Sequence, residues 1–418
     1  MFKKSLFNKE QWSWIMYDWA NSAYSIIITT AVLPIYYKAM TNSVMSDTNS
    51  TLYWTVINTV ASLCVALLGP LLGSMSDIKG YRKKIFSFLL LLGLLSTLSL
   101  AFVPYGNWGA ILFLYFLTVL GFSGTNIFYD SFLIDVASDD EMDNVSANGF
   151  AYGYFGSTIP FIISILVIVF YEKLGISNIV ATQFSFILTA VWWGVFSVPI
   201  LKNVKQKYGR ERSEGYIKKN FLQIFYTAKK VYHSKVLLIF LIAYFFYIDG
   251  VNTIIKLATI VGSDVGINAD VMLIVLVITQ LVAFPSTIIF GILSRKIKGA
   301  TLIIIAIIIY VIVCLYAMFF LRTSVDFFTL GVMIGLVQGG IQSLSRSYFA
   351  KLINKDNSGE YFGFYNVVGK FSAILGPTLY GMTFYLTNNV SLAVGSVLSL
   401  FVIGLVLFIY AEKTLKKI

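Results

Sequence analysis

Charged side chains inside long apolar stretches are the residues of this sequence whose chemistry is easiest to specify. Asp18, Asp130, Asp249 and Arg346 each lie within such a stretch. A charge at the centre of a bilayer costs roughly 2.5–3.5 kcal/mol on insertion scales, so each must pair, become neutral or face water. Because a buried carboxyl group holds its proton more tightly than an exposed one, we predict proton coupling at Asp249, Asp18 and Asp130.

Two of these carboxylates also have a structural interpretation. Asp249 is expected about 21 Å past Lys235 along a helix, where it would instead form a fixed hydrogen bond to its own or a neighbouring helix. Asp18 is shallower and would instead anchor the start of its helix. Sodium coupling is a further possibility for Asp18, because Asn21 and Ser22 offer additional oxygen ligands.

Polar residues near these charges are candidates for substrate binding. Lys370, about 14 Å into a helix at 1.5 Å per residue, would hold a substrate carboxylate or pair with Asp130 as a strut between helices. Arg346 shares the first of these interpretations. The candidate set for substrate binding is Asn21, Tyr24, Asn252, Tyr152, Gln342, Tyr365, Asn366 and Lys370.

Residue types that enzymes need are scarce in this chain. The only histidine, His233, lies in a basic connector, and Cys64 and Cys314 lie far apart in apolar stretches. The sequence therefore offers no pair of a nucleophile with a histidine base and no ligand spacing for a metal. It also lacks a Gly-x-x-x-x-Gly-Lys loop for nucleotide phosphates. We expect a protein that is not an enzyme and that uses no cofactor or metal.

The elements that carry the charged residues must be membrane-spanning. Of the 418 residues, 58% are hydrophobic and 12% are charged, and the mean hydropathy is +0.80. Soluble domains carry about 25% charged residues, so an ordinary soluble enzyme, a disordered chain and a disulfide scaffold are excluded. The net charge of +11 comes from Lys and Arg beside apolar stretches, which indicates topology rather than nucleic-acid binding.

Twelve apolar stretches reach the roughly 20 residues that a transmembrane helix needs. We predict an all-α integral membrane protein with twelve helices in two pseudo-symmetric six-helix bundles. Most Lys and Arg residues fall on one side of the spans, so both termini are expected in the cytoplasm, with the protein in a bacterial inner or plasma membrane. The predicted spans are 13–38, 52–75, 84–104, 108–136, 148–171, 178–200, 236–257, 269–293, 300–321, 327–350, 361–386 and 390–411.

The two halves of the chain repeat one another. Asp18 and Asn21 in the first predicted span match Asp249 and Asn252 in the seventh, with the same spacing. The four intramembrane charges fall in spans 1, 4, 7 and 10, and these helices are expected to face one polar cavity. Repeated halves with a site near mid-membrane are common in secondary transporters.

The domain organisation follows from this repeat. We predict an N-terminal six-helix bundle over 1–200, a cytoplasmic basic linker over 201–235 and a C-terminal six-helix bundle over 236–418. Within the linker, Phe221–Val231 would form an amphipathic helix on the membrane surface. The alternative is a solvated basic linker without such a helix.

Two groups of charges are placed to open and close a cytoplasmic gate. Asp130 and Arg346, at similar depth in opposite halves, would pair when the gate closes. Alternatively, Arg346 would pair with a helix terminus or with Glu360. A second group would form a latch that breaks and reforms between two states. The latch residues are Asp77, Arg82, Lys83 and Asp135.

Several motifs resemble a known family. Twelve spans in two sixes, with Gly73…Asp77…Gly80…Arg82-Lys83 after the second, resemble the major facilitator superfamily and its loop 2–3 signature, although Ile78 replaces the usual basic residue. More specifically, five stretches resemble the vacuolar amino-acid effluxer-like branch, the autophagy-related effluxers and their bacterial relatives. The resemblance implies the fold and secondary transport, and it implies amino acids as substrate. The stretches are Tyr17–Ala23, Asp249–Thr253, Ser345–Phe349, Gly363–Asn366 and Lys370–Pro377.

We therefore expect a secondary active transporter that moves a small solute by alternating access and is coupled to protons. An amino acid or a short peptide is the expected substrate, since acidic and basic groups coexist in the spans. The alternatives are a transporter or flippase for a lipid or other amphiphile, and a membrane receptor that does not transport. The expected partners are the small-molecule substrate, protons or sodium, and the lipid bilayer, without nucleic acid. A monomer is expected.

Overall fold

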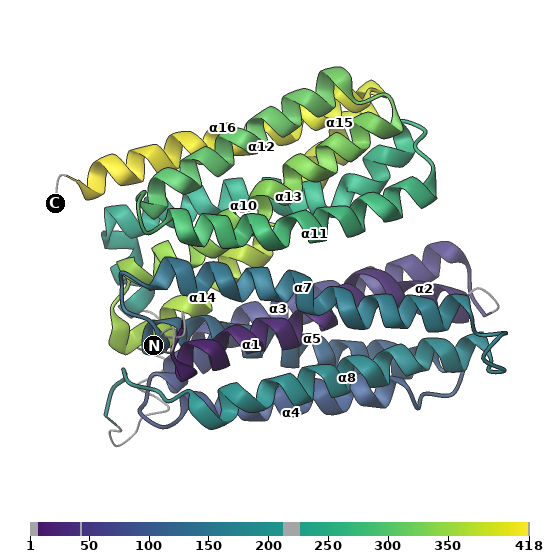
Figure 1. Ribbon diagram of the computed structural model, residues 1–418, viewed down its shortest axis with the longest axis horizontal. Helices are drawn as coiled ribbons and strands as arrows, with labels where there is room; N and C mark the ends of the chain where they lie inside the picture. The colour runs from purple at the N-terminus through teal and green to yellow at the C-terminus, as the bar shows by residue number, and fades with distance from the viewer. Residues whose placement is uncertain (1–6, 42–43, 212–225, 417–418) are drawn as a thin grey trace, which may run out of the picture. The chain divides into compact units, whose positions relative to one another are not determined.

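The computed structural model describes residues 7–41, 44–211 and 226–416, and helices account for most of them (Figure 1). In the first half of the chain these are α1 (Lys9–Tyr24), the π-helix η1 (Ser25–Ala31), α2 (Val32–Thr41), α3 (Asp47–Ser76), α4 (Arg82–Leu100), α5 (Trp108–Ser131), α6 (Leu133–Val136), α7 (Met142–Val169) and α8 (Asn178–Asn203). In the second half they are α10 (Lys235–Asp264), α11 (Ala269–Leu293), α12 (Gly299–Phe320), α13 (Ser324–Leu352), the short 3₁₀ turn η2 (Lys355–Asn357), α14 (Ser358–Phe371), α15 (Leu375–Thr387) and α16 (Val390–Leu415).

Within the described residues, 11 helical stretches are long and apolar enough to cross a membrane. The first is Lys9–Thr41, because α1, η1 and α2 follow one another without interruption. A stretch of about 20 apolar residues matches the hydrocarbon thickness of a bilayer. The chain is therefore a multi-pass integral membrane protein of the all-α class, as the composition predicts.

The predicted span over 361–386 is the one that the structure divides. α14 ends at Phe371, residues 372–374 form turns, and α15 begins at Leu375. Pro377 lies in the first turn of α15, where a missing N–H breaks no intrahelical hydrogen bond. Counted together, α14 and α15 are the twelfth span, interrupted at residues 372–374. The break leaves the first N–H groups of α15 in need of an acceptor from elsewhere.

Polar side chains cap the N-terminal ends of several helices. Asn8 and Gln11 form a reciprocal capping box at the start of α1, and Thr323 and Asp326 form another at the start of α13. Such caps satisfy N–H groups that have no partner within the helix. Single side-chain caps begin four further helices, α3, α5, α8 and α16, at Ser46, Asn107, Ser177 and Asn389.

The chain forms two compact units. Each contains most of one half of the sequence and a short segment of the other half. The first unit comprises Met1–Val136, Tyr152–Asn220 and Lys355–Gly363. The second comprises Ala137–Ala151, Phe221–Asn354 and Phe364–Ile418. The start of α7 thus belongs to the second unit, and the start of α14 belongs to the first.

Small and aromatic residues pack the helices of the first unit. Here α4 packs against α5 and α8, and α1 packs against α8 (Figure 1). Gly93 and Gly121 bring α4 and α5 together, since a Cβ on Gly121 would lie 2.5 Å from the Cα of Gly93. Trp14 of α1 stacks on Tyr129 of α5 with ring centroids 4.4 Å apart. Close approach through small residues is typical of helices packed in membranes.

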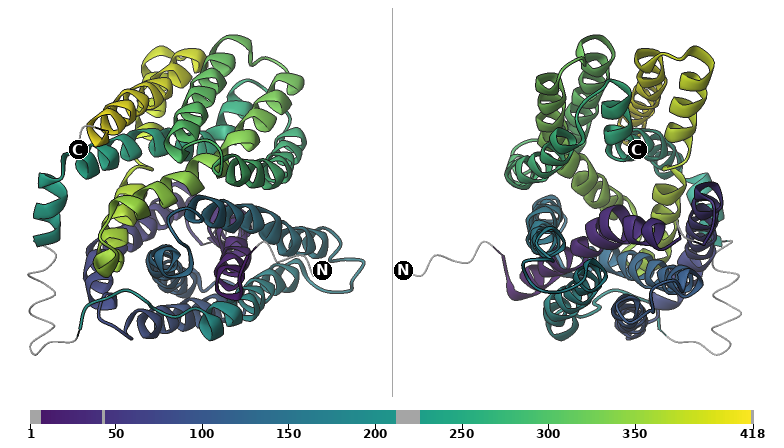
Figure 2. Two further views of the ribbon diagram at one scale, coloured as in Figure 1. Left: turned by 60° about the vertical axis from the view of Figure 1, so that its left-hand side comes forward. Right: turned by 90° about the vertical axis from the view of Figure 1, so that its right-hand side faces the viewer.

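The helices of the second unit pack mainly in pairs that are distant in sequence. α10 runs along α16, α11 runs along α13, and α12 packs against both α13 and α16; two further views show the same arrangement (Figure 2). Tyr310 of α12 stacks on Phe401 of α16, with ring centroids 5.0 Å apart and the ring planes nearly parallel. Packing of α10 along α16 places the helix that carries Asp249 against the last helix of the chain.

The predicted linker is only partly described. Residues 226–233 are helical, and Ser234 separates them from α10. The preceding part of Phe221–Val231 lies outside the described residues, so the membrane-surface helix stays a prediction.

Candidate functional site

Asp249 lies at the break between α14 and α15. Its side chain is buried on α10, and both carboxylate oxygens accept the backbone N–H of Gly376, at 3.0 and 3.1 Å. The Thr253 hydroxyl donates to the same carboxylate at 3.3 Å. Gly376 is the second residue of α15, so the carboxylate meets the positive end of a helix. The sequence leaves two interpretations of Asp249, a fixed hydrogen bond and proton coupling. The structure shows a hydrogen bond to a neighbouring helix, and the coupling role stays a prediction.

Gly376 is required for this close approach. A Cβ at this position would lie 1.9 Å from the Thr253 Oγ1 atom and 2.9 Å from a carboxylate oxygen of Asp249. Real Cβ atoms do not approach other atoms so closely, so α10 or α15 would have to move. A glycine at the start of α15 therefore lets the Asp249 carboxylate reach the backbone.

Lys370 is a second charged residue of this region. It lies at the end of α14, it is half-buried, and the described part of the chain gives its ammonium group no hydrogen bond or ion pair. Lys256 of α10 is near enough to interact electrostatically with both Lys370 and Asp249. Asn252, half-buried on α10, likewise has no side-chain hydrogen bond to a described residue. Asp249, Lys256 and Lys370 thus form a cluster of two ammonium groups and one carboxylate, and this carboxylate already binds α15.

Arg346 is held by the first turns of α7. Its Nε and one terminal nitrogen donate to the Ser146 hydroxyl and carbonyl at 2.9 and 3.1 Å, and the guanidinium lies 4.4 Å from the centre of the Phe150 ring. Near by, the Lys351 ammonium lies 2.8 Å from the Asp143 carboxylate. These contacts tie α13 to the start of α7. Pairing of Arg346 with Asp130, which belongs to the first unit, stays a prediction.

Asp18 is buried between α1 and α5 in the first unit. The Tyr129 hydroxyl donates to its carboxylate at 2.8 Å, and the Trp14 indole donates to the Tyr129 carbonyl at 2.8 Å. Two aromatic residues thus fix the position of Asp18 within the first unit. The sequence did not identify Tyr129, although it directly precedes the predicted coupling residue Asp130.

Asn21 and Tyr24 of α1, two of the predicted substrate-binding residues, form hydrogen bonds with α5. The Asn21 amide donates to the Asn126 side-chain oxygen at 2.7 Å, and the Tyr24 and Thr118 hydroxyls lie 2.7 Å apart. Asn126 was also missed, and its position one helical turn before Asp130 is the signal that would have identified it. Asp18, Asn21 and Tyr24 of α1 thus all form hydrogen bonds with side chains of α5.

The remaining predicted substrate contacts lie in both units. Tyr152 of α7 packs in the first unit against Trp12, at a ring-centroid distance of 5.3 Å. In the second unit, Tyr365 is buried and stacks between Tyr244 and Phe349, at 4.4 and 4.7 Å. Asn366 and Gln342, in the same unit, are half-buried. Tyr365 thus has aromatic neighbours on both faces, which favours a packing role over contact with a solute.

The predicted latch residues meet in a buried cluster of the first unit. Arg82 is fully buried, and its terminal nitrogens bind the Asp77 and Asp135 carboxylates at 3.0 and 2.7 Å. One of them also donates to the Ser358 hydroxyl at 2.8 Å. Lys83 donates to the Val204 carbonyl at 3.0 Å and thus binds a backbone group in place of a carboxylate. Buried ion pairs of this kind need such additional hydrogen bonds to offset the cost of desolvation.

Asp77 also binds the start of α14. Its two carboxylate oxygens accept the N–H groups of Gly359 and Glu360 at 2.7 and 3.0 Å. Burial raises the pKa of Asp77 to about 6, against the opposing effects of Arg82 and of these two N–H groups. The contact requires glycine on both sides, since a Cβ on Gly73 would lie 2.3 Å from the Gly359 carbonyl oxygen. A segment from the second half of the sequence is thereby fastened to the loop after α3.

Residues 206–211, which we call the strap, cover this cluster. The N–H groups of Lys207 and Tyr208 donate to Asp135 at 2.8 and 3.1 Å, and the Arg210 N–H donates to the Asp77 carbonyl at 2.6 Å. The Gly209 N–H donates to the Asp356 carboxylate at 3.2 Å. Sequence reasoning missed the strap, because it assigned these residues to a basic linker and backbone donors leave no trace in residue types.

Comparison with known proteins agrees with this architecture. Residues 7–417 match the family described as vacuole effluxer Atg22-like. The uncharacterized MFS-type transporter YxiO of Bacillus subtilis (strain 168) is 47% identical over 410 residues, which cover 97% of this chain and 96% of that protein. Autophagy-related protein 22-1 of Aspergillus fumigatus is 25% identical over 264 residues, which cover 57% of this chain and 43% of the fungal protein.

Two transporters are among the solved structures with a similar fold. The human organic anion transporter MFSD10 superposes with a TM-score of 0.71 at 12% identity, covering 96% of this chain and 98% of that one. The proton:xylose symporter XylE superposes with a TM-score of 0.72 at 11% identity, covering 95% of this chain and 93% of that one. Such low identities show the fold alone, which is that of the major facilitator superfamily. With this fold and a family match along nearly its whole length, the chain belongs to the Atg22-like vacuole effluxer family of MFS-type transporters.

Proposed function

We propose that the protein is a proton-coupled secondary transporter that moves an amino acid or a short peptide by alternating access. The observation that carries this proposal is Lys370, a half-buried intramembrane ammonium group without a partner in the described chain, beside the break in the helix. An ionisable residue in this setting marks a substrate or ion pathway. Broken helices form such sites in many transporters. We assign Lys370 to the carboxylate of the substrate.

The charge balance around Lys370 supports an acidic group on the substrate. Asp249 already binds Gly376 and Thr253, so it is not available as a counter-ion in this state. Lys256 adds a second positive charge near by. Asn252 supplies a neutral hydrogen-bonding group for the rest of the solute. A substrate carboxylate would therefore complete the cluster.

Proton coupling in this scheme acts through Asp249. The carboxylate holds the N-terminus of α15, and protonation would remove the charge that this helix end stabilises. Proton uptake would thus loosen α15 from α10 and would allow α14 and α15 to move about residues 372–374. Asp18 and Asp130 are the further carboxylates for this role. Sodium bound by Asp18, Asn21 and Ser22 is the alternative coupling scheme.

The buried cluster of Asp77, Arg82 and Asp135 would serve as the cytoplasmic latch. It fastens the start of α14 to the loop after α3, so it must open whenever this contact separates. We place the latch and both termini in the cytoplasm, because Lys and Arg concentrate on this side of the spans. The bacterial relative supports a bacterial plasma membrane, and a monomer is the simplest assembly.

Transport in proteoliposomes tests the proposal. Purified protein would be reconstituted with an internal pH dye, and amino-acid and dipeptide pools would be added under an imposed proton gradient. We expect substrate-dependent proton flux that is lost in Lys370→Met. The matched control is Lys413→Met, an exposed lysine on α16, which should transport normally. Absence of flux with every pool, in folded protein, would exclude these substrates, and substrate uptake without proton movement would exclude the coupling.

A further inference from the structure

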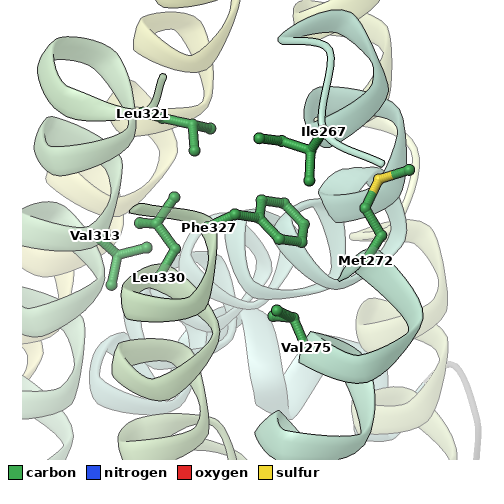
Figure 3. Packing of buried hydrophobic residues seen from close by; sticks show 7 residues of the cluster. All are labelled: Ile267, Met272, Val275, Val313, Leu321, Phe327 and Leu330. Atoms are coloured by element: carbon green, nitrogen blue, oxygen red, sulfur yellow. The ribbon is translucent and has the colours of Figure 1, made fainter. Parts of the chain in front are cut away.

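A cavity of about 110 Å³ lies inside the second unit, between α10, α11, α12, α13, α15 and α16. Its wall is formed largely by one cluster of buried apolar side chains. In Figure 3, Phe327 lies at the centre of this cluster, with Leu321 and Ile267 directed toward it. The members of the cluster that line the cavity are Val275, Val313, Leu321, Phe327 and Leu330.

Two carboxamide groups line the cavity without a partner for their hydrogen bonds. The Gln338 side chain of α13 is only 2% exposed, and no described residue donates to it or accepts from it. Gln280 of α11 is half-buried and is likewise unpartnered within the described residues. Buried polar groups in folded proteins almost always have a hydrogen-bond partner. These two groups are therefore suited to bind a polar group of a ligand.

The ligand that fits this cavity carries no charge. None of the described residues that line it is Asp, Glu, Lys, Arg or His. Asp249 accepts a hydrogen bond from the lining residue Thr253, but its carboxylate is itself bound to α15. An ion placed among apolar walls and neutral amides would lose its hydration without gaining a counter-ion. The chemistry of the lining thus excludes the zwitterion proposed for the transport site.

Size restricts the ligand further. An engineered apolar cavity of about 150 Å³ holds benzene, so a space of about 110 Å³ suits a molecule slightly smaller than benzene. We propose that this cavity is a binding site for an uncharged molecule, no larger than benzene, that carries one amide, carbonyl or hydroxyl group. The apolar part of the ligand packs against Phe327 and Leu330, and the polar group bonds to Gln338 and Gln280. The site is independent of the proposed transport function.

Direct binding of a fluorinated probe tests the proposal. We would titrate the full-length protein in lipid nanodiscs with 2,2,2-trifluoroacetamide and follow its ¹⁹F NMR signal. Saturable binding is expected, and Gln338→Leu should weaken it about fivefold, the effect of one neutral hydrogen bond. The control is Thr329→Val on the same helix, because Thr329 is exposed and does not line the cavity, and this variant should bind as the wild type does. The charged analogue trifluoroacetate should show no saturable binding.

Three outcomes would overturn the proposal. These are no saturable binding of trifluoroacetamide by the wild type, equal affinity in Gln338→Leu and Thr329→Val, and binding of trifluoroacetate as tight as that of the amide. Gln280→Leu serves as a second variant if Gln338→Leu does not fold. Non-saturable partition into the lipid is subtracted with nanodiscs that lack the protein. Binding by every variant is measured on protein that is monodisperse and has the helical content of the wild type.

Discussion

Asp77 and Asp249 each accept backbone N–H groups at the start of one half of the broken helix. Asp77 binds Gly359 and Glu360 at the start of α14, and Asp249 binds Gly376 at the start of α15. Neither helix half is capped by its own preceding side chain in these contacts. The anion in each case comes from the end or the middle of another helix. Carboxylates that are distant in sequence therefore bind the starts of both helix halves, and the one at the break itself is Asp249.

Substitutions at Asp249 should separate its charge from its hydrogen bonds. Asp249→Ala leaves the Gly376 N–H buried without an acceptor, which costs about 1–3 kcal/mol. Asp249→Asn keeps one acceptor and should cost less than the alanine variant. We expect thermal stability in detergent to fall in the order wild type, Asp249→Asn, Asp249→Ala, and proton flux to be lost in both variants. A larger loss in the asparagine variant would contradict the capping role.

Alanine at Gly376 should disturb the same contact from the other side. The new Cβ would meet the Thr253 hydroxyl, and overpacking of this kind costs about 1–3 kcal/mol. Gly381→Ala on the same helix is the control, because nothing lies within 4 Å of its Cβ position. It should be neutral or stabilising by up to about 1 kcal/mol. The two variants are compared by thermal unfolding, and equal stability would rule out the close approach.

A second change tests whether the clash with Thr253 is the cause. Thr253→Ala removes the hydroxyl that lies nearest to the new Cβ. In the double variant Gly376→Ala, Thr253→Ala, the loss should therefore be smaller than the sum of the two single losses. Additive losses would show that the Gly376 variant acts elsewhere in α15.

The sequence was sufficient for the membrane class and for most spans, because hydropathy depends on residue type alone. It was insufficient for the position of the break before Leu375, since residues 361–386 are predominantly apolar on both sides of it. At the break the Asp249 carboxylate accepts the N–H of Gly376, which has no partner within α15. The donor in this contact is a backbone group, which has no signature in residue types.

The same holds for the candidate site: ion pairs between side chains can be predicted from residue types, whereas contacts with backbone groups cannot. Arg82, Asp77 and Asp135 were grouped correctly, because opposite charges near one membrane face must pair when they are buried. Their contacts with Gly359 and with the strap were not anticipated, since backbone donors supply them. The depth of Lys370 in a predicted span indicates that it binds a substrate carboxylate or Asp130. Whether a described residue pairs with it depends on where the neighbouring helices lie, which the sequence does not show.

Asp135 should control the strap as well as Arg82. Its carboxylate binds the guanidinium and the two backbone N–H groups of Lys207 and Tyr208. Loss of one partner from a buried ion pair costs about 3–5 kcal/mol. We expect Asp135→Asn to accelerate trypsin cleavage after Lys207 and Arg210, which the strap contacts now protect. The control is Asp140→Asn, an exposed carboxylate close in sequence, and similar cleavage rates in both variants would exclude this role.

Stability should also depend on the protonation of Asp77. Its pKa in the folded protein is about 6, compared with an ordinary value of 3.8, because burial opposes the charged form. A group with a raised pKa binds its proton more tightly in the folded state, so its contribution is fully present below pH 3.8 and is lost as the pH rises through 6. At 1.36 kcal/mol per unit, the total is at most about 3 kcal/mol.

Asp77→Asn isolates this contribution from every other titrating group. Thermal unfolding of the wild type and of the variant would be measured between pH 4.5 and 8. The stability of the wild type relative to Asp77→Asn should rise as the pH falls, because only the wild type takes up the proton at this site. Most of the change should fall between pH 7 and 5, around the pKa of about 6. A relative stability that rises with pH would mean that Arg82 and the α14 N–H groups outweigh burial, and that the latch opens when Asp77 is protonated.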